Sequence, residues 1–172
     1  MKAIKLSGPI SAIAGALMLG IVPAATADQP LTVDIKRLSL DTALRIGQAA
    51  IEQCRKEGVQ IAVTVIDRGA HEQVVLRDVL AMDITLPISK QKAHTAMAFN
   101  SPTSQLEGRF KGSYSVPKLD GLIVSAGGLP INIGGTIMGG GGVSGAPSGE
   151  IDEKCAQAGI DAVRADLEMA GM

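Results

Sequence analysis

Glycine is concentrated in one stretch of this 172-residue chain, and that stretch restricts the folds the chain can adopt. Of the 21 glycines, 10 fall between Gly121 and Gly145, and residues 139–142 are four glycines in a row. Glycine in a strand permits the close approach of another backbone or of a ligand. We therefore expect a strand here that lies against another segment, a flat ligand or a second subunit.

The glycine pattern does not indicate a nucleotide-binding protein. Gly140, Gly142 and Gly145 have the spacing G-x-G-x-x-G, but a dinucleotide-binding unit needs a strand after the following helix, and none is predicted. The Lys-Ser/Thr pair of a P-loop is also missing. A net charge of −1 and an aromatic content of 2% argue against binding nucleic acid through charge or stacking.

Residues 1–27 have the pattern of a signal peptide for export. Lys2 and Lys5 precede an apolar run over residues 10–22, and residues 25–27 (Ala-Thr-Ala) provide the small side chains of a cleavage site. The run is shorter than the ~20 residues that a bilayer span needs. We expect cleavage after Ala27 and a periplasmic or secreted protein without stable membrane insertion; an uncleaved membrane anchor is the alternative.

Cys54 and Cys155 are the two cysteines of the chain. The sequence has no C-x-x-C-H motif, which excludes covalent c-type haem, and two cysteines alone do not make a zinc site. Each lies in a predicted helix, one near its end and the other near its start. Antiparallel packing of these helices would bring the two thiols together. Export would favour one disulfide between them, and two buried thiols are the alternative.

Hydrophobic periodicity predicts helices and about five strands in one domain. The expected helices cover residues 40–57, 87–100, a short segment to about 110, and 149–167. The expected strands cover residues 60–67, 74–76, 121–126, 131–133 and 136–138. The strands pair as hairpins, which indicates an antiparallel sheet. We expect an α+β sandwich over residues 38–172, after a lead-in at 28–37, with helices covering the sheet.

Four motifs then occur in the order found in one protein family. They are V-I-D-R-G-A (65–70), K-A-H-T-A (92–96) with Phe99, G-G-L-P-I (127–131), and G-G-V-S-G (141–145) followed by D-E-K-C-A (152–156). In this order they resemble the GlcG/HbpS family, often labelled haem-degrading or haem-binding. One departure is at Arg77, which is followed by Asp-Val-Leu-Ala (78–81) where the family usually has Met-Asp-Gly-Ala.

The resemblance implies a profilin-like sandwich that assembles into oligomers and binds haem. His94 and Thr95 are then the candidate haem-binding residues, and His94 is the candidate metal ligand. The resemblance places further pocket residues at Lys92, Phe99, Gly127, Gly128 and Pro130. A sensor or redox protein is the implied partner, because some relatives are secreted haem-binding proteins that act on a sensor kinase.

Three functions are therefore compared. The first is an exported haem-binding or tetrapyrrole-sensing protein without established catalysis. The second is a binding protein or enzyme for a small organic acid in a catabolic oxidation pathway, with Lys92 and the amides of Gly127 and Gly128 as anion donors. The third is an oligomeric accessory protein whose glycines serve subunit packing. Whether the protein is an enzyme is left open, and no catalytic residue is assigned.

Overall fold

The computed structural model describes residues 30–110 and 119–171, so the expected signal peptide at 1–27 lies outside the described residues. Residues 30–33 have no regular secondary structure. From residue 34 onward the described chain forms an α+β sandwich, which confirms the predicted fold class. The elements are α1 (Leu40–Lys56), β1 (Ala62–Asp67), β2 (Glu72–Arg77), α2 (Thr85–Phe99), the 3-10 helix η1 (Thr103–Leu106), β3 (Gly128–Ile133), β4 (Thr136–Ser144) and α3 (Gly149–Gly171).

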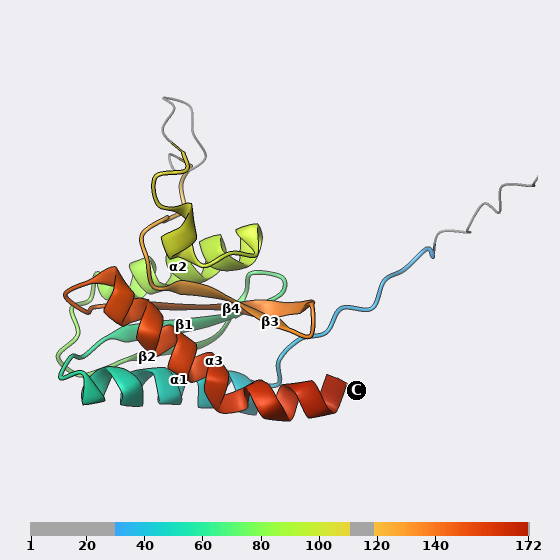
Figure 1. The fold of residues 1–172 in the computed structure, drawn as a ribbon, viewed down its shortest axis with the longest axis horizontal. Coiled ribbons are helices and arrows are strands. Elements are labelled where there is room, and N and C mark those ends of the chain that lie inside the picture. Colours follow the sequence, from blue (N-terminus) through green and yellow to red (C-terminus); the bar gives the residue numbers. More distant parts are fainter. Residues whose placement is uncertain (1–29, 111–118, 172) are drawn as a thin grey trace, which may run out of the picture. The chain divides into compact units, whose positions relative to one another are not determined.

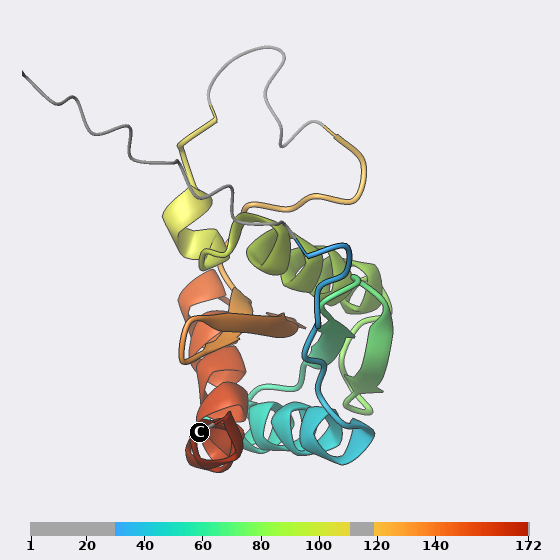
Figure 2. The same ribbon diagram turned by 90° about the vertical axis from the view of Figure 1, so that its right-hand side faces the viewer.

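The sandwich has three layers with the sheet in the middle. The strands are in the order β2-β1-β4-β3, and every neighbouring pair is antiparallel. Helices α1 and α3 cover one face of the sheet, and α2 covers the other (Figures 1 and 2). All six residues of β1 are buried, because this strand lies between β2 and β4 and is covered on both faces.

The expected strand at residues 121–126 is wrong. Two of its backbone N–H groups bond to side chains, and none of its residues pairs with a strand of the described sheet. The amide of Ile123 donates to Thr95 Oγ1 at 3.0 Å, and the amide of Ala126 donates to Glu107 Oε1 at 2.7 Å. The described chain therefore has four strands, and β3 begins at Gly128. Pro130 is tolerated within β3 because this strand is at the edge of the sheet.

Two helix boundaries also differ from the prediction. Helix α2 begins at Thr85, two residues before the expected start at residue 87. The short helix predicted to reach residue 110 is a single 3-10 turn that ends at Leu106. The start of α1 agrees with the sequence, because Ser39 Oγ accepts a hydrogen bond from the amide of Thr42 at 3.2 Å.

Helix α2 is the segment that lies against the glycines of β4. A Cβ atom on Gly142 would be 2.0 Å from the carbonyl oxygen of Ser89, and one on Gly140 would be 2.4 Å from that of Ala93. These glycines therefore allow the backbone of α2 to pack directly on the sheet. The sequence left open whether another segment, a flat ligand or a second subunit lies against this strand. On the face of β4 that carries Gly140 and Gly142, the neighbour is a segment of the same chain, helix α2.

The main core lies between the sheet and the pair α1 and α3, and a disulfide links these two helices. Cys54 and Cys155 have an S–S distance of 2.05 Å and are fully buried. Gly159 faces Ile46, so the two helices approach closely near the bridge. Among the described helices, none has the length and hydropathy that a membrane span requires.

Candidate functional site

A pocket of about 420 Å³ opens beside α2. This volume is within the range of small-molecule sites. Four of its residues recur along α2 at helical spacing, so they lie on one side of the helix. The lining consists of Ile66, Ala70, Pro87, Lys90, Gln91, His94 and Gly121. We call it the His94 pocket.

His94 is held in an orientation that suits a metal ligand. Its imidazole is partly buried, and Nδ1 is 3.4 Å from the carbonyl oxygen of Gly121. When Nδ1 carries the proton and donates to this carbonyl, Nε2 has the free lone pair. Metal-ligating histidines commonly make such a hydrogen bond through the nitrogen that does not bind the metal.

Thr95 supports the wall of the pocket. Its side chain is fully buried, and its hydroxyl donates to the carbonyl oxygen of Gln91 at 2.8 Å. The Thr95 hydroxyl oxygen in turn accepts a hydrogen bond from the amide of Ile123, so Thr95 fixes the segment that carries Gly121. Thr95 would have to give up one of these bonds to bind iron, and its predicted role as a ligand stays a prediction.

Lys90 provides a positive charge at the His94 pocket. Its side chain is about half exposed and forms an ion pair with Glu72 on β2. The hydrogen bond from Lys90 holds the pKa of the Glu72 carboxyl below its usual value. The pocket thus combines apolar contacts from Ile66, Ala70 and Pro87 with a cation that an acidic ligand group could reach.

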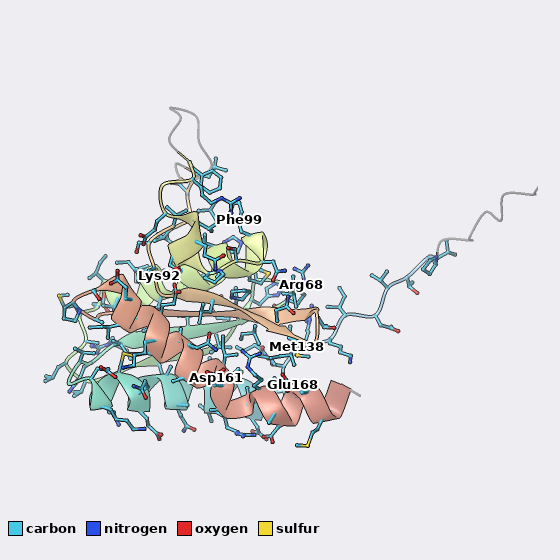
Figure 3. The ribbon with its side chains drawn as sticks, viewed as in Figure 1. Arg68, Lys92, Phe99, Met138, Asp161 and Glu168 are labelled. Carbon is cyan, nitrogen blue, oxygen red and sulfur yellow. A yellow bond between two sulfur atoms is a disulfide. The ribbon has the colours of Figure 1, made fainter. Side chains whose placement is uncertain are left out.

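The other predicted pocket residues do not line the His94 pocket. Figure 3 shows Lys92 and Phe99 at different places along α2. Phe99 packs on Phe110 with ring centroids 5.6 Å apart, and Pro130 is half-buried on β3. Lys92 is turned toward the start of α3. The structure therefore brings only part of the predicted set together around His94.

Lys92 forms a buried ion pair that the sequence analysis missed. Its Nζ donates to Asp152 Oδ2 at 2.8 Å and to the carbonyl oxygen of Val143 at 3.1 Å. Burial raises the pKa of the Asp152 carboxyl, although the hydrogen bond from Lys92 opposes this shift. In the sequence, Asp152 occurs only as the first residue of the motif D-E-K-C-A, and it lies in the first turn of α3. The available signal was the position of Lys92 on the buried side of its helix, because a buried lysine needs a partner of opposite charge.

Gly127 and Gly128 allow close packing around this ion pair. A Cβ atom on Gly127 would be 2.7 Å from Lys92 Nζ, and one on Gly128 would be 2.3 Å from the Lys92 carbonyl oxygen. Their amides donate to Glu153 Oε2 at 3.4 Å and to Thr103 Oγ1 at 2.9 Å. These amides are therefore already used within the protein and do not provide the anion site considered from the sequence.

No group of three or more His, Cys, Asp or Glu side chains in the described residues could hold a metal ion. His94 could instead complete the coordination of a metal that already has other ligands. The iron of haem is such a metal, because the macrocycle already supplies most of its ligands and a histidine of the protein can supply another. Both the imidazole and its apolar surroundings fit this group.

Comparisons with known proteins agree with this chemistry. A family model described as haem degrading protein HbpS-like matches residues 38–161. The crystal structure of HbpS is 34% identical, with a TM-score of 0.74 and coverage of 80% of this chain and 97% of that chain. A double mutant of Streptomyces reticuli HbpS is 31% identical, covers 92% and 99% of the two chains, and has a TM-score of 0.73.

A third solved structure contains haem. It is the complex of PduOC with haem, which is 27% identical and has a TM-score of 0.68. The similarity covers 73% of this chain and 94% of PduOC. A search of the curated proteins found no match.

Proposed function

We propose, because the chain belongs to the HbpS-like family of haem-degrading proteins, that it binds haem in the His94 pocket. The observation that carries the proposal is the hydrogen bond between His94 Nδ1 and the Gly121 carbonyl. This bond would leave Nε2 free for iron in a pocket with an apolar wall. Bound haem would supply an iron centre, and the protein would act as a haem-binding or tetrapyrrole-sensing protein without established catalysis.

The residues of the pocket would divide the recognition of haem between them. His94 would provide a ligand to the iron, while Ile66, Ala70 and Pro87 would contact the apolar macrocycle. Lys90 would neutralise a propionate, since an ammonium at a partly exposed site can pair with a carboxylate. Thr95 would act indirectly, by holding the segment that carries Gly121.

Titration of the purified protein with haemin, followed by absorption spectroscopy, tests the proposal. We expect a shifted Soret band in the wild type and loss of the histidine-ligated spectrum in His94→Ala. His71→Ala is the matched control, because His71 is the other histidine and its side chain is 75% exposed. An unchanged spectrum in His94→Ala, or no Soret shift in the wild type, would show that the pocket is not the haem site.

Export and assembly are proposed together with this function. The pattern of residues 1–27 supports export, and the family resemblance supports a homo-oligomer that acts on a sensor or redox partner. Intact-mass analysis of protein from the periplasm or medium should show a chain that begins at Asp28. Light scattering after size exclusion should give a mass several times that of one chain. A chain that retains Met1, or a monomer, would contradict these two proposals respectively.

A further inference from the structure

A second pocket lies where the start of α2 faces the start of α3. Its volume is about 310 Å³, and it shares no residue with the His94 pocket. Apolar side chains at its rim are Met82, Ile84 and Ile88, and polar side chains that line it are Lys92, Ser144 and Asp152. The last three are each at least nine-tenths buried. We call it the Lys92 pocket.

The Lys92 pocket has hydrogen-bond donors to spare and little free acceptor capacity. Asp152 is already occupied, because Oδ2 accepts from Lys92 and Oδ1 accepts from the amide of Ala146 at 3.0 Å. Lys92 uses two of its three N–H donors, on Asp152 and on the Val143 carbonyl. A ligand with acceptor oxygens therefore fits this site better than one with donor groups.

Ser144 is the second observation that points to a ligand. It is 6% exposed, its hydroxyl makes no hydrogen bond within the described residues, and its oxygen is not fully enclosed, so it opens into the pocket. Val143 is part of the core cluster on the other face, so alternation along β4 directs Ser144 toward α2. A hydroxyl that opens into a pocket without a protein partner can donate a hydrogen bond to a bound molecule.

The start of α3 also favours a ligand with acceptor oxygens. Ser148 and Gly149 line the pocket, and the first N–H groups of a helix favour a negatively charged or acceptor group. Asp152 already balances the charge of Lys92. A monoanion would therefore be held by hydrogen bonds and by the helix dipole rather than by an unpaired cation.

The loop before α2 keeps the apolar rim open. Met82 and Ile84 are 66% and 58% exposed. The loop is anchored by Arg55, which forms two hydrogen bonds to Asp78 at 2.7 and 2.9 Å, and by the Leu80 amide, which donates to Gln60 Oε1 at 2.7 Å. The rim can thus contact a hydrocarbon group without first becoming ordered.

We propose that the Lys92 pocket binds a small monocarboxylate with a short hydrocarbon chain. The carboxylate oxygens accept from the Ser144 hydroxyl and from the remaining N–H of Lys92. The hydrocarbon chain contacts Met82, Ile84 and Ile88. The proposal is independent of haem binding, because the two pockets have no lining residue in common.

Butyrate is a suitable probe, and two-dimensional NMR of the protein without haem can locate it. We expect saturable shift changes at residues 144–149, and Ser144→Ala should weaken binding about tenfold by removing one hydrogen bond to a charged group. His94→Ala should bind butyrate like the wild type, which separates this result from the haem test. Ser144→Ala leaves the Lys92–Asp152 ion pair in place, so the variant should remain folded.

Three results would overturn the proposal. Butyrate could produce no saturable shifts near Ser144. Ser144→Ala could bind it as tightly as the wild type. Butyramide or butylammonium could bind as tightly as butyrate, which would show that the site does not recognise a carboxylate.

Discussion

Adjacent glycines of β4 have different roles in packing, because they face different surroundings. Gly142 faces the backbone of α2, whereas a Cβ atom on Gly141 would have no heavy atom within 4 Å. We expect Gly142→Ala to lower the free energy of unfolding by about 2–3 kcal/mol, because its new methyl group would overlap the Ser89 carbonyl. Urea unfolding followed by circular dichroism measures this change.

Gly141→Ala is the matched control at the next residue. It adds the same methyl group in open space, and it reduces the freedom of the unfolded chain, so its stability should stay the same or rise by about 0.5–1 kcal/mol. Equal effects of the two substitutions would mean that α2 does not lie on β4 as closely as the structure shows.

At the scale of elements, the disulfide between Cys54 and Cys155 should provide much of the stability of the α1–α3 pair. The two residues are 101 positions apart, so the bond restricts a large part of the unfolded chain. We expect Cys54→Ala combined with Cys155→Ala to lower the free energy of unfolding by about 2–5 kcal/mol. Thermal unfolding with and without reductant measures this, and the reductant should destabilise the wild type but leave the double variant unaffected.

The elements that the sequence predicts best are those with one clear period. Helix α1 and the buried strand β1 agree with their predicted ranges within two residues, because caps and alternating apolar side chains mark them. The segment at 121–126 has the apolar composition of a strand, but two of its amides donate to the side chains of Thr95 and Glu107. Such side-chain partners come from distant parts of the chain and leave no local pattern.

At the scale of the whole molecule, the candidate site likewise depends on contacts between distant parts of the chain that no local sequence pattern shows. The motif K-A-H-T-A indicated that this part of α2 is functional, but helical geometry sends its side chains in different directions. His94 lines one pocket, Lys92 lines the other, and Thr95 is bonded between them to residue 123. Separating these roles required the neighbours of α2 in space, and Asp152 in particular is 60 residues from Lys92.

Stability toward acid is a property of the whole molecule to which several ion pairs contribute. Arg55 on α1 bonds to Asp78 after β2, and this hydrogen bond holds the pKa of Asp78 below its usual value. Lys154 on α3 lowers the pKa of Glu57 in the same way. Burial alone would raise the pKa of Asp67, but amide hydrogen bonds from His71 and Gly69 outweigh it, so that pKa is also lowered.

A carboxylate with a lowered pKa in the folded state stabilises the fold above its unfolded pKa and loses this contribution as pH falls through its folded pKa. We therefore expect the free energy of unfolding to fall as the pH is lowered below about 4, near the unfolded pKa of aspartate. The contribution of Asp152 to this pH dependence has the opposite sign, because its raised pKa means that the folded state takes up a proton more readily than the unfolded chain.

Asp78→Asn tests the contribution of one such pair to this profile. The substitution should destabilise the protein at pH 7 and make the loss of stability below pH 4 less steep, because Arg55 no longer bonds to a carboxylate whose protonation breaks the pair. Urea unfolding between pH 3 and pH 7 measures both effects, with Asp120→Asn as a control that removes an exposed carboxylate. A wild-type slope in Asp78→Asn would show that the pair between α1 and the loop does not contribute to acid stability.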